Sequence, residues 1–474
     1  MERYENLMKS IVLFVNLCLF SWTSVSSQST ERIYRDDYPY RKDSVKHEAV
    51  YQKWLQYAHE HPQDENAWHN LLELARTYDG IDGAKRYLMV QEEIKKNIPY
   101  TYLGYLHRST YYNEREMKEK AYELLPDYLF ADDYFMWVKY LEDLCDTTRM
   151  TDILQRYYDS FEYSPQMLRH DYNELQGMDK GGIIVGAEGI DIIGKLMLQF
   201  VMDVHKDKIV YDLCYNHQRS CEYNRKSFRL MDIPYPPDEE WEQWAAEQSV
   251  TPVGYNVLRW ICRYSKRPVY LSIWNQNRMN FGKDMPKDIQ KHLYNEGLLL
   301  RYSSVPYNNL KVKRRNYEER YMLEYLMMPF SPDNYQLENT KQWYKPSVLH
   351  EFLHIVHLSD LLPYYKRHDA GQYKRLNHLL LKIFERERKR NPHATLYFFY
   401  GNLYEIDGRA FGLDPIKADR NIRNNSLYSI GRMKRDKNGL ITWKREIRLE
   451  VDNDDNTALT DSVTHTKYHL IRIY

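Results

Sequence analysis

The chain of 474 residues has no net charge, because its 67 lysines and arginines are balanced by 67 aspartates and glutamates. This balance gives no electrostatic attraction towards nucleic acid, so we expect no nucleic-acid partner. Cysteine is scarce, with five residues in all, and Cys18 belongs to the N-terminal segment. Beyond that segment no run is apolar enough to cross a membrane. We therefore expect no transmembrane span in the mature protein.

Residues 1–27 have the order of a secretory signal peptide. Arg3 and Lys9 precede an apolar run at residues 11–22, and small residues follow at 25–27. The run is too short to span a bilayer. Because Cys18 lies inside the run, a lipid anchor is not expected. The pattern predicts cleavage after Ser27 and an exported protein that is periplasmic or associated with the cell envelope.

Export would leave four cysteines, and two of them are close in sequence. Cys214 and Cys221 flank a polar, turn-like stretch and could form a disulfide in an oxidising compartment. They could equally remain two ordinary thiols, because spacing alone does not fix disulfide geometry. Both interpretations stay open at this point.

Residues 28–175 are predicted to be helical. Trp68, Leu71, Leu72 and Ala75 recur at helical spacing within them. Proline punctuates helix starts every few dozen residues, which is typical of tetratricopeptide-like hairpins. Such hairpins stack into a concave binding surface. Aromatic residues make up 15% of the chain, which fits packing between hairpins.

Residues 176–306 are predicted to form an α/β domain, because apolar runs alternate there with helical patterns. Strands alternating with helices imply a parallel sheet with right-handed crossovers. Open sheets of this kind bind ligands beyond the carboxyl ends of their strands. We therefore take Glu188, Asp191 and Asn216 as candidate ligand-binding residues. The expected strands lie within 181–191 and at 208–213, 267–274 and 297–303, and the expected helices at 192–204, 237–248, 253–264 and 286–295.

Two further segments complete the chain. Residues 307–393 are predicted to be helical hairpins, with helices at 317–328, 346–365 and 372–390. Residues 394–474 are predicted to form a small antiparallel β region. Its centre is the Asn438-Gly439 turn between two strand-like runs at 427–433 and 440–451. The fold class expected for the whole chain is thus α/β with α-helical repeats.

Three stretches of the α/β segment carry a family resemblance. They are residues 181–216, the strand Arg267-Pro268-Val269-Tyr270, and residues 296–306 with the sequence EGLLLRYSSVP. They resemble the soluble C-terminal half of multi-pass, protein O-mannosyltransferase-like envelope proteins of Gram-negative bacteria. The likeness spans about residues 176–390, and it implies an envelope protein whose partner is another envelope protein or a glycan-bearing chain.

Two departures limit what this resemblance implies. The printed chain does not contain the family's membrane half, so glycosyl transfer is not implied. The acidic turn of the family is here Glu188-Gly189-Ile190-Asp191-Ile192, in which only Asp191 matches. The same stretch also comes close to a phosphate-binding loop at 189–196. Leu196 replaces the hydroxyl residue that would hold magnesium, so nucleotide binding is not favoured.

A short motif at His350-Glu351-Phe352-Leu353-His354 suggests chemistry of another kind. Two histidines four residues apart on a helix can share a zinc ion, with Glu351 as the general base for a bound water. Glu385 is the best third ligand, because an antiparallel hairpin would place it opposite residue 352. The motif also fits a packed repeat helix, whose histidines border an apolar face.

The sequence therefore leaves two functions open. The favoured one is an exported, non-catalytic binding or scaffold protein of the bacterial cell envelope that needs no cofactor. Its role would be linked to protein glycosylation or envelope assembly. The alternative is a zinc metallopeptidase that uses His350, Glu351 and His354.

Overall fold

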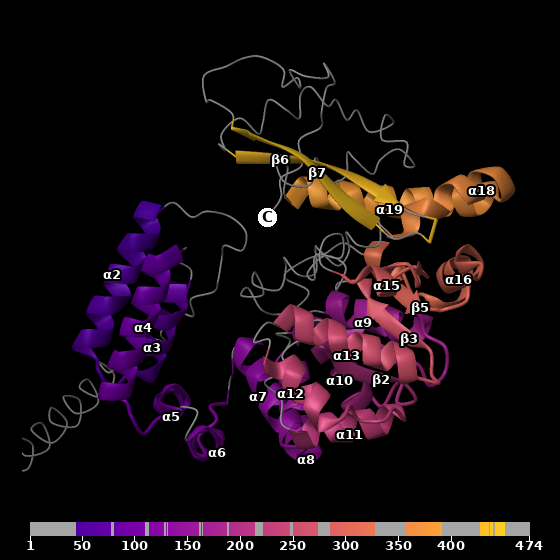
Figure 1. Ribbon diagram of the computed structural model, residues 1–474. Coiled ribbons are helices and arrows are strands. Elements are labelled where there is room, and N and C mark those ends of the chain that lie inside the picture. Colours follow the sequence, from indigo (N-terminus) through magenta and orange to yellow (C-terminus); the bar gives the residue numbers. More distant parts are fainter. Residues whose placement is uncertain are drawn as a thin grey trace, which may run out of the picture. The chain divides into compact units, whose positions relative to one another are not determined.

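The computed structural model describes most of residues 44–390, together with the hairpin at 427–450 (Figure 1). Within the described part, no helix is long and apolar enough to cross a membrane. The predicted signal peptide lies outside it. The chain divides into two compact units, residues 1–127 and 128–474. Positions not described inside these limits are 77–79, 110–112, 128, 130, 161–162, 164, 187–188, 214–220, 247–249, 274–284, 328–356, 436 and 439–440.

The first unit is helical. Its central helix α3 packs against α2 and α4 and buries the predicted apolar face, including Trp68 and Leu71. The Asp64 carboxylate begins α3 by accepting from the backbone N–H groups of Asn66 and Ala67. The helical prediction is thus confirmed, but a tetratricopeptide-like repeat is not. The helices are α2 (Ser44–Glu60), α3 (Glu65–Arg76), α4 (Gly80–Asn97), α5 (Tyr102–Arg108) and α6 (Glu114–Glu123).

The second unit begins with three helices, α7 (Ala131–Asp143), α8 (Thr147–Asp159) and α9 (Pro165–Gly177). All three contact α10, the helix that follows the first strand. The predicted domain boundary at residue 175 therefore lies inside this unit. Helices α7–α9 belong to the same compact body as the sheet.

The sheet has five strands in the order β2-β1-β3-β5-β4. Strand β1 pairs in parallel with β2 and β3, as predicted, whereas β5 runs antiparallel to β3 and β4. The prediction of a parallel sheet is therefore wrong for β5, which corresponds to the last predicted strand. A tight turn at Gly297, with φ +107°, reverses the chain between β4 and β5. The strands are β1 (Ile183–Gly186), β2 (Ile209–Asp212), β3 (Val269–Ser272), β4 (Leu293–Asn295) and β5 (Leu299–Tyr302).

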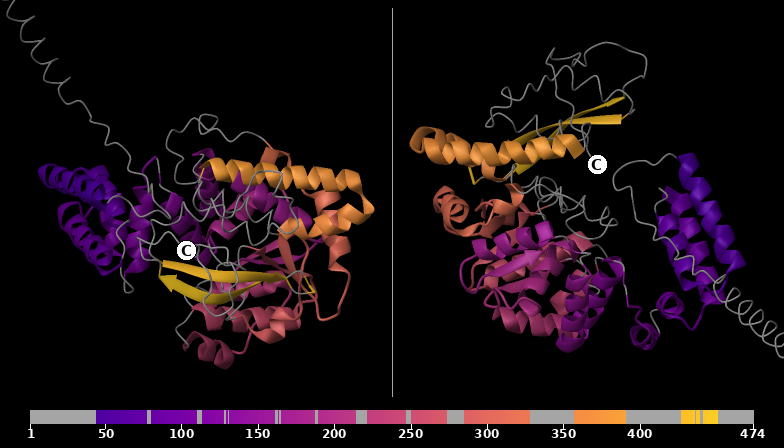
Figure 2. Two further views of the ribbon diagram at one scale, coloured as in Figure 1. Left: turned by 90° about the horizontal axis from the view of Figure 1, so that it is seen from above. Right: turned by 180° about the vertical axis from the view of Figure 1, so that it is seen from behind.

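Helices cover both faces of this sheet, which explains why its strands are continuously apolar. One face packs Ile184 and Tyr270 against α9 and α10 (Gly189–Phe200). The other packs Val185 and Leu271 against the helices between β2 and β3. Those are α11 (Cys221–Met231), α12 (Asp238–Ala246) and α13 (Val250–Tyr264), and Figure 2 shows the second unit from two further sides.

The segment after β3 departs from the predicted helices. The expected helix at 286–295 is only α15 (Lys287–Gln290), and its second half is strand β4. The expected helix at 317–328 is a π-helical turn followed by a 3-10 turn. Helix α19 and the β6–β7 hairpin are confirmed. The remaining elements are α16 (Asn309–Arg315), η2 (Asn316–Arg320), η3 (Glu324–Met327), η5 (Ser359–Leu361), α18 (Leu362–His368), α19 (Ala370–Arg390), β6 (Leu427–Arg435) and β7 (Ile441–Glu450).

Candidate functional site

The parallel strands end at one edge of the sheet, and polar residues gather there. Strands β1, β2 and β3 end at Gly186, Asp212 and Ser272. The chain leaves β1 through α10 on one face, and it reaches β3 through α11–α13 on the opposite face. The carboxyl ends of β1 and β3 thus form a topological switch point, where open α/β sheets bind their ligands.

A buried lysine lies beside this switch point. The Lys195 side chain on α10 has no solvent exposure. Its Nζ lies 2.6 Å from Asp171 Oδ1, 2.6 Å from Glu174 Oε2 and 3.1 Å from Asp191 Oδ1. It also donates to the Asp191 carbonyl oxygen at 2.5 Å. Three carboxylates from α9 and α10 therefore surround one ammonium group, and we call these four residues the Lys195 cluster.

Neighbouring groups complete the hydrogen bonds of the cluster. The Ser272 hydroxyl at the end of β3 donates to Glu174 Oε1 at 2.8 Å. The Tyr163 hydroxyl donates to Asp171 Oδ2 at 2.5 Å. His170 Nε2 lies 3.6 Å from Glu174 Oε1. The cluster thus joins α9, α10 and β3 through charged contacts that water does not reach.

Burial governs the protonation of these groups. It raises the pKa of Asp171 to about 7, even though Lys195 acts to lower it. Burial also raises the pKa of Asp191 and lowers that of His170 well below its usual value. Burial acts to lower the pKa of Lys195, but the three carboxylates raise it more, so that it lies well above the usual range. Near neutral pH the cluster therefore pairs a charged lysine with a neutral histidine and a partly protonated Asp171.

Glycines allow the helices to approach this closely. A Cβ atom at Gly194 would lie 1.9 Å from Asp171 Oδ2, and one at Gly186 would lie 2.9 Å from Asp191 Oδ2. Gly194, which contributed to the likeness to a phosphate-binding loop, thus serves the packing of α10 on α9. The ammonium of Lys195 is occupied by carboxylates, so it does not face a phosphate site.

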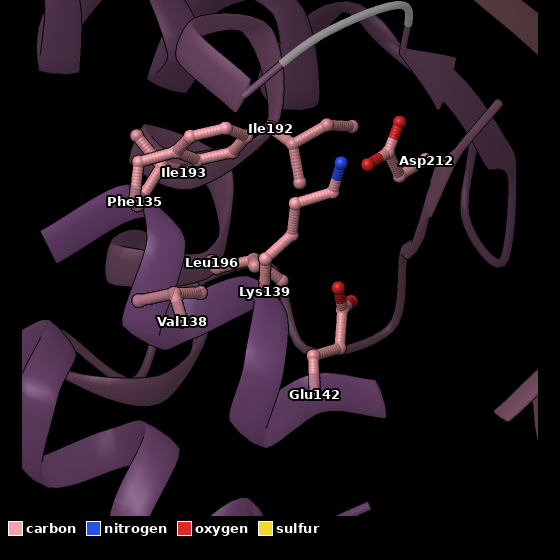
Figure 3. A pocket seen from close by; sticks show the side chains of 8 residues that line it. All are labelled: Phe135, Val138, Lys139, Glu142, Ile192, Ile193, Leu196 and Asp212. Atoms are coloured by element: carbon pink, nitrogen blue, oxygen red, sulfur yellow. The ribbon is translucent and has the colours of Figure 1, made fainter. Parts of the chain in front are cut away.

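A small hollow lies on the other side of α10, beside the end of β2. It is shallow, and its enclosed volume is about 10 Å³. Figure 3 shows Lys139 reaching in from α7, with its ammonium directed towards the Asp212 carboxylate. The wall combines apolar side chains with three charged ones. The lining residues are Phe135, Val138, Lys139, Glu142, Ile192, Ile193, Leu196 and Asp212.

The three predicted ligand-binding residues have different outcomes. Asp191 lies at the switch point, but its side chain is 1% exposed and paired with Lys195. Glu188 and Asn216 lie outside the described residues. Sequence reasoning missed Asp171, Glu174 and Asp212. The available signal was a lysine inside the apolar stretch IIGKLML, because a buried lysine requires carboxylate partners.

Most of the residues predicted to bind zinc or to form the disulfide lie outside the described residues. His350, Glu351 and His354 lie outside the described residues, and Glu385 is placed only by its position in α19. Among the described positions, no group of histidine, cysteine, aspartate and glutamate could hold a metal ion. Cys214 lies outside them too, and Cys221 begins α11.

Comparisons with protein-family models, with curated proteins and with solved structures give no match.

Proposed function

We propose that the protein is an exported, non-catalytic binding or scaffold protein of the bacterial cell envelope. In this proposal the carboxyl edge of the parallel strands binds an envelope protein or a glycan-bearing chain. The N-terminal helices would be tetratricopeptide-like and would offer a second, concave surface. Export and the envelope location rest on the order of residues 1–27 and on the family resemblance.

One observation carries the proposal: the hollow beside β2 lies at the edge where open α/β sheets bind ligands. Its enclosed volume of about 10 Å³ leaves room for about one water molecule, far below the range of about 300–1,000 Å³ that is typical of small-molecule sites. A hollow of this size does not enclose a ligand, so the proposed partner would contact this edge as a surface. The aromatic ring of Phe135 beside Lys139 offers apolar and charged contacts to such a partner.

The Lys195 cluster supports a role without catalysis. A general acid or base must come within hydrogen-bond reach of its substrate. Lys195 and Glu174 have no exposure, and Asp171 is 2% exposed. The charges of these residues are paired with one another, which favours a structural role beneath the binding edge.

Site-specific photo-crosslinking in cells tests the proposal. A benzophenone amino acid replaces Phe135, which lines the hollow. The matched control replaces Phe200, an aromatic residue that is 39% exposed at the opposite end of α10. We expect a discrete adduct in the envelope fraction from position 135 and none from position 200.

Two results would count against this function. The first is the absence of any adduct from position 135 in a folded, exported protein. The second is an equal set of adducts from both positions, because such a result would indicate contacts that are not confined to the carboxyl edge of the sheet. A glycosidase treatment that shifts the adduct would separate a glycan-bearing partner from an unmodified protein.

A further inference from the structure

A group of arginines surrounds a single carboxylate at the opposite, amino edge of the sheet. Asp179 precedes β1, whereas Arg301 lies on β5, Arg315 ends α16 and Arg320 ends the π-helical turn η2. Arg301 Nη1 lies 3.0 Å from Asp179 Oδ2. Arg315 Nη2 and Arg320 Nη2 each lie 3.5 Å from Asp179 Oδ1. Three parts of the chain thus bring these charges together: the residues before β1, strand β5, and the adjoining elements α16 and η2.

The charges at this edge do not balance. Three guanidinium groups face Asp179, and the next carboxylate, Glu296, lies 3.7 Å from Arg301. Glu296 also accepts a hydrogen bond from the Tyr307 hydroxyl at 2.6 Å. The edge therefore carries an excess of positive charge that a bound anion would neutralise.

The donor geometry also leaves capacity for another acceptor. A separation of 3.5 Å exceeds the usual N–H···O range, so Arg315 and Arg320 make long contacts with Asp179. The Nε–H of Arg315 is shielded from solvent and has no hydrogen-bond partner among the described residues. A shielded donor without an acceptor is costly, and a bound oxyanion would supply the acceptor.

The other two arginines are held in place before any ligand arrives. Arg301 lies between two aromatic rings, 5.7 Å from the Tyr270 centroid and 5.6 Å from the Tyr307 centroid. Arg320 Nη1 donates to the Gly177 carbonyl at 2.8 Å. Arg320 also ends a π-helical turn, an uncommon element that occurs frequently at functional sites. The side chains remain accessible, with exposed fractions of 27% for Arg301, 41% for Arg315 and 24% for Arg320.

We propose that Arg301, Arg315 and Arg320 form a binding site for the phosphate group of a phosphoester. Guanidinium groups bind phosphate through paired N–H donors. Three of them from different directions match a tetrahedral group with several acceptor oxygens, and Asp179 occupies part of that position in the free protein. This site lies at the edge opposite to the hollow, so it is independent of the function proposed above.

Isothermal titration of the full chain with inorganic phosphate, at constant ionic strength, tests the site. Arg315→Gln removes an arginine that has no hydrogen bond to any described residue, so we expect the variant to keep its fold and to bind phosphate about tenfold more weakly. Asp179→Asn removes the competing charge while keeping the side-chain shape, and we expect binding about tenfold tighter. The matched control is Arg259→Gln, whose arginine pairs with Asp288 on the surface. It leaves the affinity unchanged.

The proposal is overturned if phosphate shows no saturable binding to the wild type, or if Arg315→Gln and Arg259→Gln weaken it equally. If Asp179→Asn does not fold, the phosphate affinities of the wild type and of Arg315→Gln still test the proposal. Two further ligands identify the source of the phosphate. Tighter binding of glycerol 3-phosphate indicates a soluble phosphoester. Sedimentation with phosphatidylglycerol vesicles, but not with phosphatidylcholine vesicles, indicates a lipid headgroup.

Discussion

Replacing Lys195 with methionine removes the single cation from a buried group of three carboxylates. The substitution keeps the length of the side chain and its apolar stem, so it creates no large cavity. It leaves Asp171, Glu174 and Asp191 without the ammonium that lies 2.6–3.1 Å from each of them. We expect the second unit to lose much of its stability.

The size of the effect follows from burial. Breaking a buried ion pair by removing one partner costs about 3–5 kcal/mol, because the other charge stays uncompensated. Asp171 has a pKa of about 7, so it can take up a proton near neutral pH and relieve part of the repulsion. Glu174 has no exposure and stays next to Asp191. For a unit of about 350 residues, the loss lowers the melting temperature by about 4–7 °C.

Urea unfolding of the full chain, followed by circular dichroism and tryptophan fluorescence, measures this loss. The control is Lys366→Met on α18, an exposed lysine whose replacement should change stability by less than about 0.5 kcal/mol. The double variant Lys195→Met, Asp171→Asn should be more stable, by at least about 1 kcal/mol, than the sum of the two single effects predicts. The reason is that the two residues are in contact. If Lys195→Met costs no more than Lys366→Met, the cluster does not stabilise the fold as argued.

Three further predictions concern pH, metal and export. The raised pKa of Asp171 means that the folded state binds its proton more tightly than the unfolded state, so the resulting stability is lost as pH rises through about 7. Between pH 7 and pH 4, wild type should gain about 3 kcal/mol relative to Asp171→Asn in denaturant titrations, and a constant difference would refute this. Elemental analysis of the purified protein should find no stoichiometric zinc, whereas one zinc per chain, lost in His354→Ala, would favour the metallopeptidase. N-terminal sequencing from an envelope fraction should begin after Ser27, and an intact N-terminus on cytoplasmic protein would contradict export.

Local patterns predicted most of the secondary structure. A short apolar run bounded by glycines gave β1, further short apolar runs gave β2 and β3, and helical spacing gave α10 and α13. Local patterns did not predict the direction of every strand, because direction depends on how each connection returns to the sheet. The three-residue strand β4 follows directly after α15 and has no period of its own to separate it from a helix. The turn at Gly297 then reverses β5.

The site was harder to predict than the fold, because its parts come from distant segments. Asp191 was found since it follows a strand, where ligand residues are expected. Asp171 and Glu174 lie on α9, whose polar residues look like an ordinary solvated helix face until α10 packs on it. The arginines around Asp179 come from β5, α16 and η2, and no sequence spacing connects them. Contacts of this kind follow from tertiary packing alone.

The central claim is that a partner binds at the carboxyl edge of the parallel strands. Its most direct test is the affinity of the cross-linked partner, once purified, for two lysine variants measured by isothermal titration. Lys139 lines the hollow at that edge, whereas Lys266 is an exposed lysine just before β3, at the amino edge. The account predicts binding about tenfold weaker for Lys139→Ala and unchanged binding for Lys266→Ala. Unchanged binding for Lys139→Ala, with a loss for Lys266→Ala, would contradict it.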